Sequence, residues 1–415
     1  MEYTLLIVYL ACAFGFIMSW GVGANDLANI MSPTLGSKSI TPRQAVILAI
    51  LFEFAGAMYG SNGVSETISS KIIIGTAQLD NSNIYIYGML AVLSAGTTWM
   101  LLASYLGLPV SITNTIIGGM VGFGAAQLGA DAINWKQVGV IALSWITSPA
   151  IAGIIAYQLF NNVQSVILRT TDPMRNARRY IPLYLFFVGI ILGYMIILKA
   201  LNHYGYHFNY LLKICIVIGT GFIVMGVGII FVRKINTHST HTQEERFGYV
   251  EKLFSVIMAF TACSMIFAHG SNDVAVAIGP ILAVIQIALK NGYLQPHPFQ
   301  NWITLMGCSG VILGLLMYGR KVIETVGSSI TALTPSRAYA ATIAAAFTVI
   351  LSTSAGIPVS ATQTLVGAVF GVGLARGIGA LNLQVIRNIF MSWIITIPVA
   401  SLLAMLFFLL YKNIF

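Results

Sequence analysis

Charged side chains are scarce in this sequence. Asp, Glu, Lys and Arg make up 8% of the 415 residues, whereas an average soluble domain has roughly 25%. Apolar residues reach 57%, and apolar runs near the ~20 residues that cross a bilayer recur along almost the whole chain. A water-soluble fold is therefore excluded. We expect an all-α polytopic membrane protein with about 12 transmembrane helices.

Catalytic and metal-binding motifs are also missing. The four cysteines stand singly in apolar segments, with no CxxC pair or His spacing typical of zinc or redox centres: Cys12, Cys215, Cys263 and Cys308. The sequence has no paired His and Glu metal motif, no nucleophile beside a base and no nucleotide-binding domain. These absences argue against an enzyme, and we expect no cofactor.

The basic residues follow a topological pattern. The formal charge is +9, but the basic residues are dispersed, with no basic domain that would favour nucleic acid. Two polar segments, 169–179 and 233–252, carry Arg and Lys and are separated by two apolar runs, so both lie on one side of the bilayer. The positive-inside rule makes that side cytoplasmic and places the N-terminus outside. Short loops favour a bacterial inner membrane.

Two sequence blocks occur twice, in the same order. The Asn-Asp block reads GANDLAN from Gly23 and returns as GSNDVAV from Gly270. The Pro-Val-Ser block reads GLPVSITNT from Gly107 and returns as GIPVSATQT from Gly356. Chance similarity between apolar helices is common, but matched blocks in one order are not. Transporters often carry two such structural repeats.

The repeat divides the chain into three regions. The first transmembrane repeat is 1–160, the second is 253–415, and 161–252 is a connector with two basic cytoplasmic loops and about two spans. The span count gives the two Asn-Asp blocks opposite directions across the bilayer. We therefore expect inverted-topology repeats, with broken or re-entrant helices at the midplane.

Three acidic residues, Asp26, Glu53 and Asp273, fall within apolar surroundings. An ionised carboxylate in hydrocarbon costs at least a few kcal/mol, so each needs a partner. Asp26 and Asp273 follow Asn25 and Asn272 in stretches whose glycine and proline permit the helix to unwind. Freed carbonyls would then join these side chains around a cation, with sodium at Asp26 and Asp273. The alternative is that each Asn-Asp pair only holds neighbouring helices together.

Other polar side chains have no single predicted role. Glu66 and Glu324 lie in more polar stretches and would be interfacial. His269 precedes the second Asn-Asp block, where the first repeat has Val22. A proton relay, a cavity lining and a structural histidine all remain open for His269, as does the role of Glu53.

The Pro-Val-Ser blocks have the composition of helix starts. Proline suits the first turn of a helix, and hydroxyls with free backbone N–H groups there form an anion cradle assisted by the helix dipole. The alternative is that each hydroxyl bonds back to the preceding turn. The predicted oxyanion contacts are Ser111, Thr113, Thr115, Ser360, Thr362 and Thr364.

Charge balance predicts coupled transport. Two carboxylates and an anionic substrate in one dry cavity repel strongly unless they are neutralised. Sodium ions or protons would neutralise them. Sodium is preferred, because Asn side chains and freed carbonyls coordinate a metal ion but do not hold a proton at neutral pH.

The sequence also resembles a known family. GANDLANIMSPTLGSKSIT, HGSNDVAVAIGP, GLPVSITNT and GIPVSATQT are similar to the duplicated signature of the inorganic phosphate transporter (PiT) family, from about Gly23 to Pro398. The resemblance implies about twelve helices in inverted repeats, phosphate as substrate and sodium or proton coupling. It also implies a homodimer, since members are often dimers.

Family positions fall on residues already selected. The essential Asn-Asp pairs match Asn25 with Asp26 and Asn272 with Asp273, and the Ser-x-Thr elements match Ser111 with Thr113 and Ser360 with Thr362. The His that usually follows Ser-x-Thr is replaced by Asn114 and Gln363, which we assign to the substrate site. Val276 stands where the second Asn-Asp block usually has Asn.

We therefore expect a secondary active transporter in a lipid bilayer. It would import inorganic phosphate by cation symport, with sodium favoured over protons, through alternating access around a midplane site. Its partners would be phosphate and sodium ions. The alternative is a symporter of another tetrahedral oxyanion such as sulfate. An enzyme or a channel fits less well, because a channel would not need two duplicated buried carboxylates.

Overall fold

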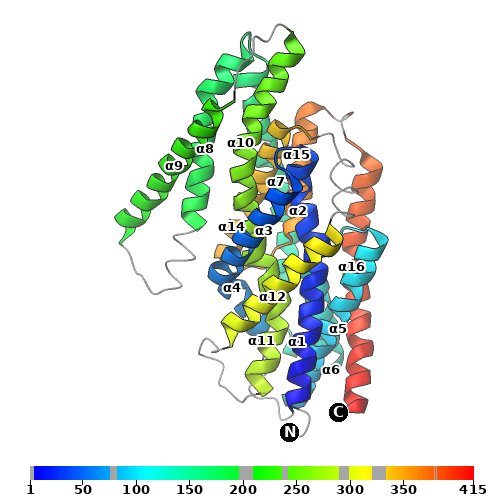
Figure 1. Ribbon diagram of the computed structural model, residues 1–415. Coiled ribbons are helices and arrows are strands. Elements are labelled where there is room, and N and C mark those ends of the chain that lie inside the picture. The colour runs from blue at the N-terminus through cyan, green and yellow to red at the C-terminus, as the bar shows by residue number, and fades with distance from the viewer. Residues whose placement is uncertain are drawn as a thin grey trace.

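The computed structural model is almost entirely helical (Figure 1). It describes residues 4–74, 82–195, 209–235, 242–288, 299–319, 333–377, 379 and 381–415. Within these residues, 8 helical stretches are long and apolar enough to cross a membrane. The prediction of a helical protein with several membrane-spanning segments is confirmed at this level, whereas the expected twelve helices and the three-part division stay predictions.

The first half begins at the N-terminus and ends at residue 168, after a long helix and one π-helical turn. Its elements are α1 (Thr4–Val22), η1 (Gly23–Leu27), α2 (Ala28–Gly36), α3 (Pro42–Gly60), α4 (Asn62–Glu66), η2 (Thr67–Lys71), α5 (Ser82–Leu106), α6 (Ile112–Gln127), η4 (Ala130–Ala132), α7 (Trp135–Val163) and η5 (Gln164–Leu168).

Two helices that pack against each other follow the first half, and the second half of the chain comes after them. The pair is α8 (Pro173–Met195) and α9 (Tyr210–Arg233), and the second half contains α10 (Gln243–His269), η7 (Gly270–Val274), α11 (Ala275–Ala288), α12 (Gln300–Gly314), η8 (Leu315–Gly319), α14 (Pro335–Ser354), α15 (Ala361–Arg376) and α16 (Leu383–Ile414). In Figure 1, α1 rises from the N-terminus, whereas α10 descends toward α11.

Local sequence sets where several helices begin. Thr41 caps α3 by accepting from the backbone N–H of Gln44, whose side chain accepts in turn from the Thr41 N–H, and proline follows as the first helical residue. Thr242 and Glu245 make the same reciprocal pair at α10. Both pairs satisfy N–H groups that lack a partner inside the helix.

The two halves interlock through helices that contact across the repeat boundary. α7 packs against α15, and α6 packs against α16. Glycine permits the first contact, because a Cβ atom on Gly371 would collide with the carbonyl oxygen of Gly153. At the second contact, a Cβ atom on Gly122 would lie 2.6 Å from the Ser401 Cβ atom.

Two hydrophobic cores result, and each draws on both halves. One core joins α1, α3, α5 and α6 to α11, α12 and the end of α16. The other core joins α7 and α8 to α10, α14, α15 and the start of α16. The repeats of the sequence are therefore not separate packing units.

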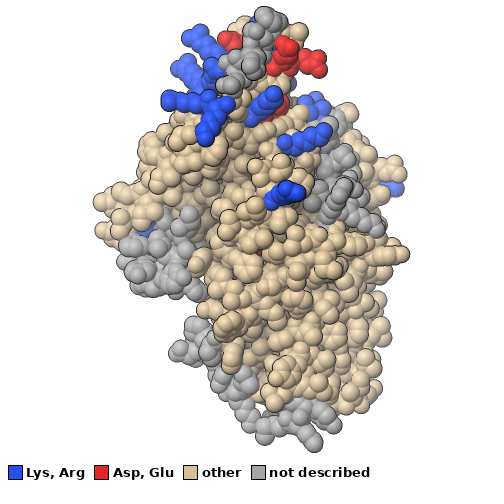
Figure 2. Space-filling view, in the orientation of Figure 1, with Lys and Arg blue, Asp and Glu red and all other residues tan. Residues whose placement is uncertain are grey.

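Basic side chains gather at one end of the molecule (Figure 2), where the ends of α8, α9 and α10 lie in Figure 1. Much of the remaining visible surface carries neither acidic nor basic groups. The second polar segment, expected as a loop, is partly helical, since Arg246 and Lys252 lie on α10. The assignment of this end to the cytoplasm stays a prediction.

The α7–α15 contact makes a testable demand on residue size. Gly371→Ala would force two backbones apart, and overpacking of this kind costs about 1–3 kcal/mol. We expect a lower thermal unfolding midpoint for the purified protein in detergent. Gly226→Ala in α9 is the matched control, because an added Cβ atom meets nothing within 4 Å there. Equal midpoints for the two variants would contradict this packing.

Candidate functional site

Each Asn-Asp block lies in a π-helical turn. η1 and η7 continue directly into α2 and α11, and Pro33 and Pro280 lie inside those helices. The expected unwinding therefore takes a milder form, in which one wide turn interrupts the α-helical hydrogen bonding while the helix continues. Such turns occur frequently at functional sites.

The asparagine of each Asn-Asp block binds the backbone that precedes a helix of the same half. Asn25 Nδ2 donates to Leu108 O at 2.9 Å, and its Oδ1 accepts from Val110 N at 3.4 Å. Asn272 Nδ2 donates to Val359 O at 2.6 Å, and its Oδ1 accepts from Val359 N at 3.2 Å. These contacts bring the two duplicated motifs together in both halves.

Each Pro-Val-Ser block is a turn between two helices that pack against each other, α5 with α6 and α14 with α15. Gly107 and Gly356 both have φ of 69°, a left-handed conformation that glycine adopts at little cost. α6 and α15 then begin, with Ser111 and Ser360 as their caps, each accepting from the backbone N–H three residues on, at 3.3 Å and 3.2 Å. The helices therefore begin at the serines, and Pro109 and Pro358 precede these caps instead of lying in the first turn, where the sequence analysis expected proline.

The starts of α6 and α15 meet. Thr113 Oγ1 donates to Val359 O at 2.9 Å, across the two halves. The positive ends of two helix dipoles are therefore close to one another and to both Asn-Asp blocks. The predicted site residues are all closed off from solvent, since none of the twelve is more than 4% exposed: Asn25, Asp26, Asn272, Asp273, Ser111, Thr113, Asn114, Thr115, Ser360, Thr362, Gln363 and Thr364.

Most of the predicted oxyanion contacts already have local partners. Ser111 Oγ donates to Asn114 Oδ1 at 3.2 Å, and Ser360 Oγ lies 3.1 Å from Thr362 Oγ1. Thr115 Oγ1 donates to Ser111 O, and Thr364 Oγ1 donates to Ser360 O, both at 2.8 Å. These bonds are the backbone interaction that threonine usually makes inside a helix. The hydroxyls of Thr115 and Thr364 thus donate to backbone carbonyls, whereas those of Ser111 and Ser360 meet side-chain oxygens.

The first Asn-Asp block contains two buried oxygen atoms without a partner among the described residues. Asp26 Oδ2 accepts from Ile112 N at 3.4 Å, but Asp26 Oδ1 and Asn29 Oδ1 accept no hydrogen bond there. Asn29 Nδ2 donates to Asn25 Oδ1 at 3.2 Å. The sequence interpretation did not include Asn29 among the ligands, although it is the last residue of the block GANDLAN. Carboxylate and amide oxygens are ligands that hard cations take.

The other acidic residues singled out in the sequence differ in their exposure to solvent. Glu53 is fully buried, and its Oε1 lies 2.7 Å from His269 Nδ1. Glu66 lies at an exposed position and pairs with Lys71 at 2.9 Å, and its place at the membrane interface stays a prediction. Glu324 lies outside the described residues.

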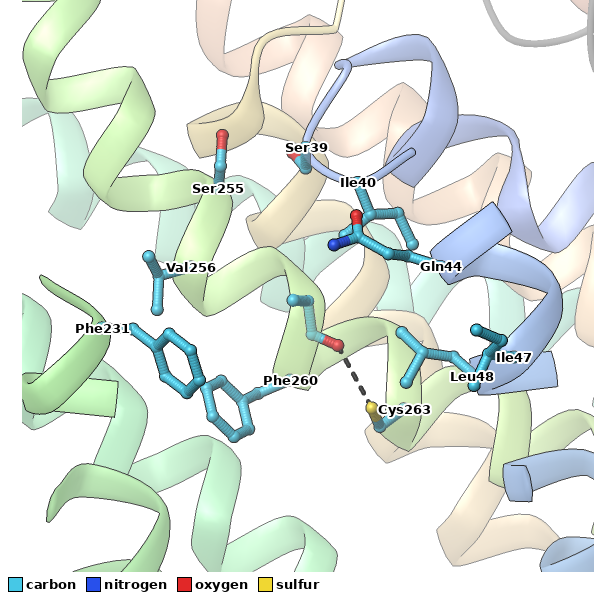
Figure 3. A pocket seen from close by; sticks show the side chains of 11 residues that line it. Ser39, Ile40, Gln44, Ile47, Leu48, Phe231, Ser255, Val256, Phe260 and Cys263 are labelled. Atoms are coloured by element: carbon cyan, nitrogen blue, oxygen red, sulfur yellow. Dashed lines mark hydrogen bonds between the residues drawn. The ribbon is translucent and has the colours of Figure 1, made fainter. Parts of the chain in front are cut away.

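Two cavities lie beside this region and do not include it. One, of about 450 Å³, lies between the start of α3, the end of α9 and the face of α10 that carries Phe260 and Cys263 (Figure 3). The other, of about 770 Å³, lies beside α2, the start of α3 and η8. None of the predicted ligands lines either cavity. Cys263 donates its Sγ–H to Ala259 O at 3.2 Å.

Comparison with known proteins gives matches along nearly the whole chain. The model of the phosphate transporter family matches residues 22–404. A Haemophilus influenzae protein named "Putative phosphate permease" is 42% identical over 416 residues, covering 100% of this chain and 99% of its own. A Pyrococcus abyssi protein also named "Putative phosphate permease" is 37% identical over 399 residues, covering 96% of both chains.

A solved structure is also similar. It is described as "The sodium-dependent phosphate transporter", with a TM-score of 0.87 and 35% sequence identity. The match covers 99% of this chain and 100% of the other.

The contact between the two helix starts predicts a difference between two threonines. Thr113→Val removes the hydrogen bond from Thr113 Oγ1 to Val359 O, which joins the two halves. We expect the free energy of unfolding to fall by about 1 kcal/mol, with a lower thermal unfolding midpoint. Thr115→Val removes only a bond inside its own turn and should change the midpoint less. The account of this junction is wrong if both variants unfold at the same temperature.

Proposed function

The chain belongs to the phosphate transporter family, and from this premise we propose that it imports inorganic phosphate by symport with sodium. The transported ions would bind where the two Asn-Asp blocks meet the starts of α6 and α15. Access to this region would alternate between the two sides of the membrane. Since the family and the structural neighbour are transporters, the missing catalytic motifs fit this function.

The observation that carries the proposal is the junction of two helix starts inside a closed region. Ser111 and Ser360 cap α6 and α15, and Thr113 links the two starts. Backbone N–H groups and the dipoles of both helices favour an anion at this point. Phosphate oxygens would accept from these N–H groups and from the Ser111 and Ser360 hydroxyls, which would exchange their side-chain partners Asn114 and Thr362 for the anion. Thr113 would have to give up its bond to Val359 O to join them.

Unpartnered oxygen atoms support a cation site beside the anion. Asp26 Oδ1 and Asn29 Oδ1 are both buried without a partner among the described residues. A buried acceptor left unpaired costs about 1–3 kcal/mol, and more when it is charged. Sodium is a hard cation that takes oxygen ligands, so its binding would remove this cost. A proton on Asp26 would neutralise the carboxylate and supply a single O–H donor, whereas sodium can take several oxygen ligands at once.

The two ions would depend on each other. Phosphate brought next to Asp26 and Asp273 adds negative charge to a region from which water is excluded, and such repulsion is strong at low dielectric constant. A bound sodium ion cancels part of that charge. Phosphate binding without sodium is therefore expected to be weak, which is the physical basis of the coupling.

Gln363 favours phosphate over sulfate. Its Oε1 is buried and has no hydrogen-bond partner among the described residues. Phosphate near neutral pH still carries an O–H group that can donate to such an acceptor, whereas sulfate carries none. Sites built to pair with a ligand hydroxyl reject analogues that lack it. The names of the relatives that we compared refer to phosphate, so the alternative of sulfate gains no support.

Opposite helix directions support the inverted arrangement. α1 with η1 and α10 with η7 carry equivalent blocks, and they run in opposite directions in Figure 1. We propose inverted-topology repeats on this basis. The N-terminus would lie outside and the basic end in the cytoplasm. A homodimer and the bacterial inner membrane stay predictions.

Transport by the purified protein in proteoliposomes tests the function. We expect radiolabelled phosphate to accumulate when sodium is present outside, and to stop accumulating when choline replaces sodium. Excess sulfate should not inhibit uptake. Asp26→Asn should abolish uptake, because it removes the ionised ligand of the cation. Asp131→Asn, at an exposed position on η4, is the matched control and should transport normally.

Two outcomes would contradict the proposal. Equal accumulation in sodium and in choline would exclude sodium symport. Wild-type uptake by a folded Asp26→Asn variant would remove this carboxylate from the cation site.

A further inference from the structure

Three buried side chains form a line that leads to one of the two duplicated carboxylates. His269 Nδ1 lies 2.7 Å from Glu53 Oε1, and His269 Nε2 lies 3.0 Å from Asp273 Oδ2. The side chains of Glu53 and His269 are fully buried, and that of Asp273 is 2% exposed. The second contact is at ion-pair distance but outside hydrogen-bond alignment. The line connects α3 to α10 and to η7.

The second half therefore holds its carboxylate differently from the first half. Asp273 Oδ1 accepts from Asn272 Nδ2 at 2.7 Å, while its Oδ2 faces the imidazole of His269. Both oxygens of Asp273 thus have a neighbour in the protein. Asp26 has one long backbone contact, to Ile112 N, and an Oδ1 atom without a partner among the described residues.

Equivalent positions in the first half are apolar. Val22 takes the place of His269 in the repeat. α12 faces η1 as α3 faces η7, since a Cβ atom on Gly23 would collide with the carbonyl oxygen of Val311 and one on Gly270 with that of Glu53. Val311 is thus the counterpart of Glu53. The same helix packing is made once with two valines and once with a glutamate and a histidine.

Glu53 and His269 are not needed for the packing of these helices. Burying ionisable groups costs several kcal/mol per ion, and replacing a buried ion pair by apolar residues is often neutral or stabilising. The first half already forms the contact with Val22 and Val311, so close packing of these helices does not require Glu53 and His269. The presence of Glu53 and His269 at these buried positions therefore has another cause. The contacts that they form end at the Asp273 carboxylate.

We propose that Glu53 and His269 are positioning residues for Asp273, and that the two halves of the site bind cations unequally as a result. Glu53 orients the His269 ring, and the ring holds Asp273 Oδ2. Asp273 is thereby fixed in advance for the cation, whereas Asp26 acquires its orientation when the cation binds. This inference rests on the proposed sodium symport and adds to it a division of labour between the repeats.

The sodium dependence of phosphate uptake tests the inference. Partners that orient a metal ligand typically change metal affinity by about 10–100-fold when they are removed. His269→Gln should therefore raise the sodium concentration for half-maximal uptake by about 10-fold or more, with the maximal rate at saturating sodium largely retained. Ser264→Ala is the matched control, because Ser264 is buried on α10 and, among the residues that the structure describes, bonds to Phe260 O in its own helix and to nothing else.

Glu53→Gln provides a second variant in case His269→Gln does not fold. It keeps the size of the side chain and alters the same line from α3 without changing α10. We expect a shift of the sodium dependence in the same direction. An unchanged sodium dependence in either variant, when the protein is folded, would overturn the inference, as would a loss of maximal rate alone.

A direct binding measurement shows whether the two residues act through Asp273. Sodium that binds the folded state raises its thermal unfolding midpoint. In an Asp273→Asn background, His269→Gln should cause no further loss of sodium-dependent stabilisation. A further loss would show a separate role. Failure of the proposed function would appear already in the wild type, as uptake indifferent to sodium, whereas failure of this inference would appear only in the variants.

Discussion

The structure depends on how charge is kept inside an apolar bundle. Carboxylates and an anionic substrate are stable at low dielectric constant only where oriented dipoles, hydrogen bonds and counter-ions surround them. Asn25 and Asn272 supply part of these hydrogen bonds, because each joins its Asn-Asp block to the backbone that precedes α6 or α15. The carboxylate and the helix start are therefore held together in each half.

Interlocking of the halves brings the two helix starts and the two Asn-Asp blocks into one region. α6 packs on α16 and α15 packs on α7, so the helix starts of different repeats meet at Thr113 and Val359. Movement of one half relative to the other would change this shared region directly. Under the proposed inverted repeats, duplication supplies a symmetric scaffold. His269 and Glu53 stand where the first half has Val22 and Val311, and this difference makes the two carboxylates, Asp26 and Asp273, unequal.

Sequence patterns could predict the parts of the site that repeat. The Asn-Asp and Pro-Val-Ser blocks stand out because both occur twice in one order, and the composition of the second block predicts a helix start. Proline was expected in the first turn of that helix, whereas it precedes the caps Ser111 and Ser360. The π-helical turns could not be predicted, since they depend on packing around Gly23 and Gly270. The contact of Glu53 with His269 joins residues 216 positions apart, and no local pattern indicates such a pair.

The central claim is that phosphate rests in this closed region only together with a cation. Calorimetric titration of the purified protein tests it most directly, with phosphate added in sodium and in choline buffer. The account predicts measurable phosphate binding in sodium, little in choline, and an increase of sodium affinity by phosphate of the same factor, as linkage requires. Equal phosphate affinity in the two buffers would contradict it.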